Sequence, residues 1–337
     1  MNHKEIISNK QLANYLRCDI SFLKKAINEE YLVFDTNNIN TSSHNSIRID
    51  RFHIKKKGKE TGYRIVYSVF THQLSNSLKI LNNYLSDIFV PEDCVHGFVN
   101  GKSIKTNAFE HISKQIILSV DIKNFFETIT DKMVSDALQQ IGFQKEISKS
   151  ISKITTVNGK LVQGFNTSPT LANIVVHQMD LKLMELSDKD ISYTRYADDL
   201  YFSTNSMLPN QKEIEQIINS FGFELNASKT KIMKRGQEQF VTGLTAFDNI
   251  YPRIPKRIKR NLRLEIYFIR KYGYIKHAKR RLKNQGIKIE NQDFQFEIEQ
   301  QIIEIQHRLF GWIHYIHSIE PDLGKKLYGR LIGAKKR

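Results

Sequence analysis

Two adjacent aspartates, Asp198 and Asp199, lie within an apolar and aromatic stretch that runs from Tyr193 to Ser203. Strand-like runs on both sides of a short polar step predict a β-hairpin with the aspartates at its tight turn. Adjacent carboxylates repel each other, and burying them is costly unless a cation neutralises them. A divalent metal ion would do so, and Mg²⁺ prefers oxygen ligands, usually one or two carboxylates together with substrate phosphates.

A third carboxylate, Asp121, follows a short apolar run from Ile116 to Val120 that predicts a buried strand. Asp121 could then meet Asp198 across a sheet. Two metal ions about 4 Å apart, bridged by such carboxylates, would activate a 3′ or 2′ hydroxyl and stabilise a leaving pyrophosphate. Phosphoryl transfer requires positioning and charge neutralisation more than covalent chemistry. A polar turn is the alternative for Asp198 and Asp199 alone, but the three aspartates together favour a catalytic site.

The charge of the chain predicts a polyanionic partner. Its 337 residues include 51 Lys and Arg against 35 Asp and Glu, which gives a net charge of +16. Nucleic acid is the commonest partner for such a protein, although charge alone does not separate an enzyme from a passive binder. Residues 246–337 hold 21 Lys and Arg against 9 Asp and Glu, so this segment carries 12 of the 16 surplus charges. A basic unit at the C-terminal end explains this shift most simply.

Cysteine content and hydropathy predict a cytoplasmic protein with no membrane partner. Cys18 and Cys94 lie far apart and form no metal-ligand spacing, so free thiols in a reducing cytosol are expected. The polar first residues lack the apolar core of a signal peptide. No apolar run approaches the roughly 18 residues of a membrane-spanning helix.

Local patterns predict an α+β protein with three parts: residues 1–50, 51–245 and 246–337. Strands are expected in a 51–69 hairpin that turns at 58–62, in the 192–203 hairpin and in a strand pair over 230–245, while 34–50 is expected to be a loop. Helical spacing and capping residues predict helices over 6–30 (as two short helices), 75–88, 131–142, 144–154, 168–186, 211–221, 256–272, 274–285 and 294–317. A DNA-reading helix-turn-helix is an alternative for 6–30, where an ordinary packing unit is favoured.

Three motifs resemble those of reverse transcriptases, in the order that family has them. Tyr196-Ala197-Asp198-Asp199 resembles the catalytic box, Asp121 to Phe126 the first-aspartate motif, and Gln163 to Pro169 the QGxxxSP motif that opens a palm helix. The resemblance runs from about Ile54 to the C-terminus. It implies a right-hand polymerase with fingers, an antiparallel palm sheet and a basic helical thumb, which would be an RNA-directed DNA polymerase.

Two further motifs resemble those of bacterial retron reverse transcriptases. Asn107 to His111 resembles their NAxxH signature, and Val241-Thr242-Gly243 their VTG element. Membership would imply a cognate structured noncoding RNA, priming from a 2′-OH of a guanosine in it, and a branched RNA-linked DNA (msDNA) made in anti-phage defence with an effector protein. The alternatives are an abortive-infection or group II intron-like reverse transcriptase, and a non-catalytic RNA-binding protein on a polymerase scaffold.

The resemblance also assigns roles to single positions. Asp121, Asp198 and Asp199 would bind two Mg²⁺ ions, with Mn²⁺ as a possible substitute, and Asp199 would be the least direct ligand. The residues expected to bind the incoming dNTP are Arg64, Phe126, Gln163, Gly164 and Lys229. Arg64 suits phosphates because its planar fork binds bidentately, and Phe126 would exclude a 2′-OH. A solvated basic hairpin, core packing of Phe126 and a surface lysine are the respective alternatives.

Contacts with RNA or primer are expected from two places. The first comprises Asn107, His111, Val241, Thr242 and Gly243, and the second the basic start of the thumb at Lys256, Arg257, Lys259 and Arg260. Such cations bind the phosphate backbone. An apolar stripe from Ile302 to Ile316 is expected to form thumb core.

Overall fold

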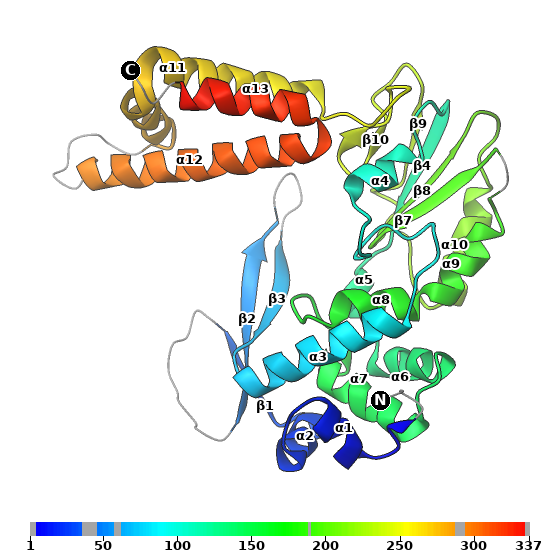
Figure 1. Cartoon of the computed structure of the whole chain (residues 1–337). Coiled ribbons are helices and arrows are strands. Elements are labelled where there is room, and N and C mark those ends of the chain that lie inside the picture. Colours follow the sequence, from blue (N-terminus) through cyan, green and yellow to red (C-terminus); the bar gives the residue numbers. More distant parts are fainter. Residues whose placement is uncertain (1–4, 36–45, 57–61, 188–189, 287–293, 334–337) are drawn as a thin grey trace. The chain divides into compact units, whose positions relative to one another are not determined.

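The computed structural model describes residues 5–35, 46–56, 62–187, 190–286 and 294–333 (Figure 1). The chain forms two compact units. The first combines Met1–Ser103 with Gln115–Met233, and the second combines Ile104–Lys114 with Lys234–Arg337. Within the described ranges, no helix has the length and apolar character needed to cross a bilayer.

A four-stranded sheet, here called the palm sheet, is the centre of the first unit. Its strands lie in the order β7, β8, β4, β9, and β8 pairs antiparallel with both β7 and β4. The strands are β4 (Ile116–Asp121), β7 (Ser192–Tyr196), β8 (Asp199–Thr204) and β9 (Lys231–Lys234). The predicted buried strand and the predicted hairpin around the aspartates are both confirmed. Mixed helices and antiparallel strands also confirm the α+β class.

Helices cover one face of the palm sheet. In Figure 1, α9 (His177–Met184) and α10 (Gln211–Ser220) lie side by side along it. Buried Met179 and Ile214 from these helices belong to the same apolar core as Val120 of β4. Burial of such side chains stabilises the fold by about 1.5–3 kcal/mol each. The rigid sheet therefore presents its strand ends, where the aspartates lie, from a well-packed support.

The fingers region of the first unit contains a mixed three-stranded sheet. β2 (Ile47–Lys55) pairs parallel with β1 (Tyr31–Asp35) and antiparallel with β3 (Tyr63–Val69), which confirms the predicted hairpin. The prediction of a loop over 34–50 was wrong at both ends. Ile47 and Ile49 alternate with polar residues and are buried, so they belong to a strand. Residues 36–45 and the turn residues 58–61 lie outside the described residues.

The remaining helices of the first unit largely match prediction. Ser8 caps α1 by accepting a hydrogen bond from the Gln11 N–H, as its residue type predicts. The predicted 168–186 helix is two helices, because Val176 (φ −90°, ψ 5°) interrupts it. The elements not yet given are α1 (Asn9–Tyr15), α2 (Ile20–Ile27), α3 (His72–Ile88), α5 (Phe125–Thr128), α6 (Asp131–Gln140), α7 (Lys145–Thr155), α8 (Ser168–Val175), β5 (Thr156–Val157) and β6 (Lys160–Leu161).

Three helices dominate the second unit. α11 (Lys256–Asn284) and α12 (Phe294–Ile319) match the predicted helices, and Gly273 (φ 80°) breaks α11 at the predicted point. α13 (Pro321–Ile332) was not predicted. Ile305, Leu309 and Ile313 are buried, which confirms the expected thumb core. The rest of the predicted 230–245 strand pair forms a small hairpin, β10 (Phe240–Val241) with β11 (Leu244–Thr245), against which α4 (Ile104–Phe109) packs.

Glu320 connects the starts of α11 and α13. Its carboxylate accepts hydrogen bonds from the Ile254 N–H at 2.9 Å and from Lys259 Nζ at 3.1 Å. Arg253 lies 3.6 Å away on the same carboxylate. Glu320 is buried, so these partners offset the cost of removing its charge from water.

Candidate active site

Three aspartates gather at one end of the palm sheet. Asp121 is the last residue of β4, and Asp199, the first residue of β8, lies directly opposite it in the antiparallel register. Asp198 occupies the turn just before β8, where its carbonyl accepts a hydrogen bond from the Ile122 N–H at 2.9 Å. The register partner of Asp121 is therefore Asp199, while Asp198 adjoins the β4 end through the backbone.

Burial and the neighbouring carboxylates raise the pKa values of Asp198 and Asp199. Burial, together with the negative charges of Asp198 and Asp121, raises the pKa of Asp199 to about 7, and the charge of Lys229 opposes this rise. Burial also raises the pKa of Asp198, with Asp121 adding to it, while its own backbone N–H, Lys229 and Arg64 oppose the rise. Negative charge in this place is therefore unfavourable until a cation compensates it.

Lys229 is one source of that compensation. Its Nζ lies 3.4 Å from Asp121 Oδ2. The loop that carries Lys229 is fixed to the strand end, because the Asn226 N–H donates to the Asp121 carbonyl at 2.8 Å. The structure thus brings the predicted lysine against a predicted catalytic carboxylate.

The donor set suits a hard divalent cation. All three side chains are carboxylates, and Mg²⁺ commonly takes one or two of these and completes its shell with substrate phosphates and water. Within the described ranges, no group of three or more His, Cys, Asp or Glu side chains is arranged to hold a metal ion by itself. The three aspartates thus supply oxygen ligands of the type that Mg²⁺ prefers.

Three predicted nucleotide-binding residues belong to the fingers and to the loop beside them. Arg64 is an exposed residue of β3 and lies close enough to lower the pKa of Asp198. The Gln163 carbonyl accepts a hydrogen bond from the Tyr67 N–H at 2.8 Å, which attaches this loop to β3. Gly164 has φ +109°, and a Cβ there would lie 2.0 Å from the Tyr67 carbonyl oxygen. Glycine is therefore required at position 164 because the backbone there lies against the backbone of β3.

Phe126 lies in α5, five residues after Asp121. Its ring makes edge contacts with Phe125 and Phe98, with centroid distances of 5.4 and 6.2 Å. The side chain is only partly buried. Phe126 therefore packs on the core and keeps part of its surface accessible. Phe98, with φ +62°, was not assigned a role from sequence.

The two retron-like motifs meet in the second unit. α4, which carries Asn107, contacts the β10–β11 hairpin, whose turn is Thr242-Gly243. Thr242 Oγ1 donates to the Ile104 carbonyl at 3.0 Å. Asn107, His111 and Val241 are fully buried. The buried residues of the two motifs therefore hold α4 and the β10–β11 hairpin together as one module. Gly243, in the turn of the hairpin, is exposed.

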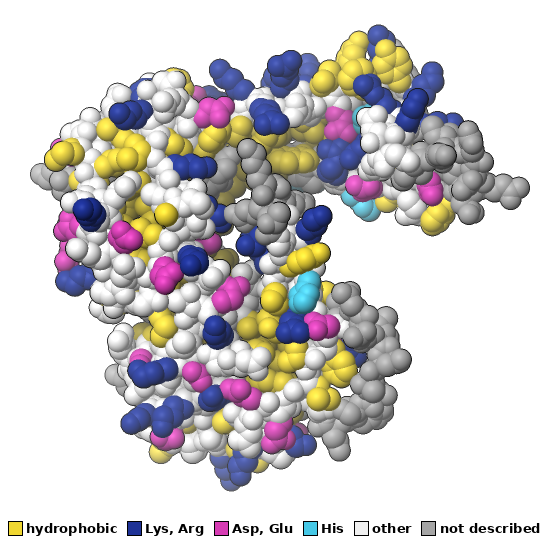
Figure 2. All heavy atoms as spheres, turned by 180° about the vertical axis from the view of Figure 1, so that it is seen from behind, with side chains coloured by type: hydrophobic (Ala, Val, Ile, Leu, Met, Phe, Trp, Pro, Cys, Tyr) yellow, Lys and Arg dark blue, Asp and Glu magenta, His cyan; other side chains and the backbone are white. Residues whose placement is uncertain are grey.

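The predicted basic residues of the thumb differ in their surroundings. Lys256, Arg257 and Arg260 line a groove on the first turns of α11, and Arg257 and Arg260 are exposed there. Lys259 lines the same groove, but its ammonium is paired with Glu320. Figure 2 shows many Lys and Arg side chains over the surface of the chain, several of them along the helices of the second unit.

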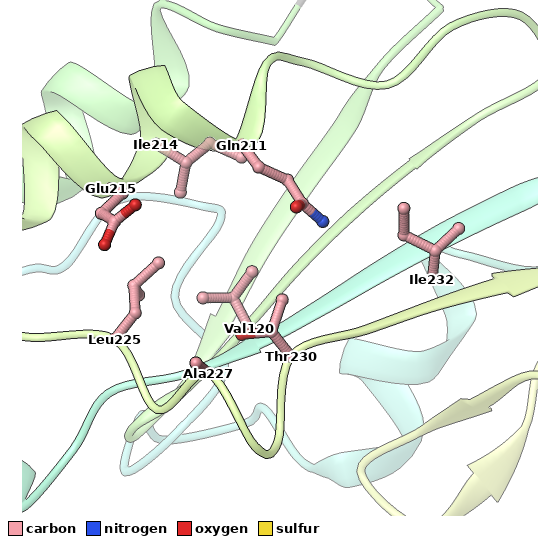
Figure 3. Close-up of a pocket in the computed structure, with 8 residues that line it drawn as sticks. All are labelled: Val120, Gln211, Ile214, Glu215, Leu225, Ala227, Thr230 and Ile232. Carbon is pink, nitrogen blue, oxygen red and sulfur yellow. The ribbon is translucent and has the colours of Figure 1, made fainter.

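A separate pocket of about 450 Å³ lies between α10 and β4 (Figure 3). Val120, Ile214 and Leu225 give it an apolar wall, and Gln211 extends toward it from the start of α10. Val120 and Asp121 are neighbours in a strand, so their side chains point to opposite faces of the sheet. The pocket is therefore distinct from the carboxylate site.

Comparison with known proteins identifies the family. Residues 54–301 match the family described as "Reverse transcriptase (RNA-dependent DNA polymerase)". The chain belongs to this family. A solved structure of apo telomerase from Candida Tropicalis, truncated from its C-terminal domain, aligns with a TM-score of 0.42 and 12% identity over 60% of this chain and 54% of that one. A similarity at that level supports no further inference.

Curated relatives narrow the resemblance to retron enzymes. The retron Mx65 reverse transcriptase of Myxococcus xanthus is 33% identical over 44% of this chain and 40% of that protein. The retron Ec86 reverse transcriptase of Escherichia coli is 33% identical over 57% and 61%, and the retron Ec73 enzyme of the same species is 28% identical over 81% and 83%. The predicted resemblance to bacterial retron reverse transcriptases is confirmed. The chain covers 40% of the length of the Mx65 enzyme and 61% of the length of the Ec86 enzyme.

The raised pKa of Asp199 predicts a pH-dependent stability. Its carboxyl keeps a proton in the folded chain up to about pH 7, whereas an unfolded Asp loses it near pH 4. The folded state binds more protons between these values, so stability falls as pH rises through this window. We expect Asp199→Asn to raise the unfolding midpoint in EDTA, with a gain over wild type that grows from pH 5 to pH 8.

Asp136→Asn provides the control, because it makes the same chemical change at an exposed residue of α6. Parallel pH profiles for Asp199→Asn and wild type would show that burial does not hold the proton on Asp199.

Proposed function

We propose that this chain is an RNA-directed DNA polymerase of the retron type. One observation carries the proposal: Asp121, Asp198 and Asp199 adjoin one another at the end of the palm sheet, in a chain of the reverse transcriptase family. Clustered carboxylates are costly to keep when one is buried and two are half-buried, and their cost is explained if a cation and a polyphosphate substrate complete the site.

The proposed chemistry is transfer of a nucleotidyl group from a dNTP to a hydroxyl. Bound Mg²⁺ would supply neutralisation of phosphate charge and acidify the attacking hydroxyl. Asp121 and Asp198 would hold the cation, and Asp199 would contribute charge and fix the strand register. Lys229, already 3.4 Å from Asp121, would attract the leaving pyrophosphate. Mn²⁺ has the same preference for oxygen ligands and is the proposed alternative ion.

The residues around the aspartates would select and orient the dNTP. Arg64 would bind phosphate oxygens bidentately. Phe126, partly exposed beside Phe98, would lie under the sugar and reject a 2′-OH by steric conflict. Gln163 and Gly164 would act mainly by holding β3, and with it Arg64, at the site, because both contact Tyr67.

The proposed RNA partner follows from the relatives, whose names describe retron enzymes. We infer a cognate structured noncoding RNA as template and primer, with a branched RNA-linked DNA (msDNA) as product. The α4 and β10–β11 module would hold that RNA through Gly243 and neighbouring exposed residues, supported by buried Asn107 and His111. A cytoplasmic role in anti-phage defence with an effector protein belongs to the same proposal.

The polymerase assignment predicts that Asp198→Asn abolishes DNA synthesis. Loss of one charged ligand would remove several kcal/mol of transition-state stabilisation, so primer extension should fall at least about 10³-fold. Binding of an RNA–DNA duplex, measured by fluorescence anisotropy, should change less than about twofold because Asp198 is not a phosphate contact. Asp136→Asn, on exposed α6, is the control. Extension at the wild-type rate by Asp198→Asn would refute the metal-binding role.

The thumb predicts different outcomes for neighbouring cations. Arg257→Ala and Arg260→Ala should each reduce the slope of log K against log salt for duplex binding by about one, because each removes one phosphate contact. Lys259→Ala should leave that slope unchanged and lower the unfolding midpoint, since it deprives buried Glu320 of its closest cation. Equal slopes for all three variants and wild type would exclude a phosphate role for this groove.

The retron assignment predicts a specific nucleic acid bound to the purified chain. The protein should be isolated from cells that express it with its native flanking DNA, and the bound material sequenced. We expect one RNA linked through a 2′–5′ bond to DNA, with a mobility that a debranching enzyme alters. Asp198→Asn should retain the RNA without DNA. Recovery of unselected host RNA with the wild-type protein would contradict the retron assignment.

A further inference from the structure

A completely buried arginine lies just before the aspartate turn. Arg195 is in β7, two residues before Ala197, and its side chain is 0% exposed. Its backbone is also fixed, because its N–H donates to the Cys94 carbonyl and its carbonyl accepts from the His96 N–H, both at 2.8 Å. A charged residue buried in this strand requires partners, since an unpaired buried guanidinium is strongly unfavourable.

The guanidinium makes four hydrogen bonds to three partners. Nε and NH2 bind the two oxygens of Asp180 at 2.8 and 2.7 Å, and Asp180 is itself buried in α9. NH1 donates to Asn173 Oδ1 of α8 at 3.0 Å and to the Ala197 carbonyl at 3.2 Å. Arg195 therefore joins two helices to the backbone of the turn. The interruption between α8 and α9 falls between its two helical partners.

The residue that Arg195 contacts has an unusual conformation. Ala197 has φ +57°, in the left-handed region that residues other than glycine seldom adopt. Surrounding contacts must hold such a residue in place. Gly97 supports it from the other side, because a Cβ on Gly97 would lie 2.4 Å from the Ala197 nitrogen. The Gly97 carbonyl in turn accepts from Asn173 Nδ2 at 3.0 Å.

We infer that Arg195, oriented by Asp180 and Asn173, is a positioning residue that holds the Ala197 turn and thereby sets where Asp198 presents its carboxylate. The inference rests on the proposed polymerase function and adds to it a set of residues that touch neither substrate nor metal. Small displacements of a ligand reduce binding and rate strongly, because a preorganised site tolerates errors of only about 0.5 Å. Loss of the Arg195 contact should therefore weaken metal binding more than it weakens nucleic-acid binding.

The test uses Arg195→Met/Asp180→Asn in the full chain. Both charges leave together, so no unpaired buried charge remains, and the side-chain amide introduced by Asp180→Asn can still accept the hydrogen bond that Tyr193 donates to Asp180. We expect Mn²⁺ binding, followed by electron paramagnetic resonance, to weaken at least tenfold, and the Mg²⁺ concentration for half-maximal extension to rise by a similar factor. KM for dNTP at saturating Mg²⁺ and the duplex affinity should stay within about twofold of wild type.

Arg51→Met/Asp35→Asn is the matched control, because Arg51 and Asp35 form a bidentate pair of the same kind between β1 and β2. It should leave Mn²⁺ binding unchanged. If the Arg195 variant folds and binds Mn²⁺ as wild type does, the inference is overturned. If that variant does not fold, Asn173→Ala provides the test. It keeps the ion pair between Arg195 and Asp180 and removes the hydrogen bonds from Asn173 to Arg195 and Gly97. A roughly threefold loss of Mn²⁺ affinity in this variant supports the inference, and no loss overturns it. An inactive wild-type chain would instead refute the proposed function, which separates the two failures.

Discussion

The concentration of negative charge at the end of the palm sheet is the constraint on which the site depends. Strand pairing places Asp121 opposite Asp199 and brings Asp198 beside them, and burial makes the ionisation of Asp198 and Asp199 unfavourable. Two cationic side chains of the first unit partly compensate this negative charge: Lys229 on a loop and Arg64 on the fingers strand β3. A bound metal ion would complete this compensation, and the substrate phosphates would complete the shell of the metal ion. Neutralisation of the aspartates would therefore be coupled to substrate binding.

The most predictable elements were those with a local cause. The hairpin around the aspartates follows from strand-like runs on both sides of a short polar step, and the α1 start follows from the capping side chain of Ser8. Elements with distant causes were missed. β2 pairs in parallel with β1, and nothing in the sequence between them marks that pairing. The interruption of the predicted 168–186 helix lies at Val176, a residue with no helix-breaking chemistry, next to helices that both bind Arg195.

The site shows the same division. The residue pattern predicted that Asp121 and Asp198 meet, and the resemblance to reverse transcriptases added Lys229, which lies 3.4 Å from Asp121. Gly164 was predicted to contact the incoming nucleotide, and the fold adds a close approach to the Tyr67 carbonyl, a contact between segments almost 100 residues apart in the chain. Arg195 is the charged residue of its strand, and the fold shows that it is buried and therefore needs charged or polar partners. Its acceptors in α8, in α9 and in the turn could be named only from the fold, since spacing alone does not specify them.

The location of the metal ions tests the central claim most directly. Crystals of the chain with an RNA template, a DNA primer that lacks its 3′-OH, a dNTP and Mn²⁺ would locate the ions by anomalous scattering. Our account predicts anomalous peaks between the carboxylates of Asp121 and Asp198, in contact with the phosphates of the dNTP and on the same side of the palm sheet as Lys229. Mn²⁺ bound away from these two carboxylates, with the dNTP in place, would contradict it.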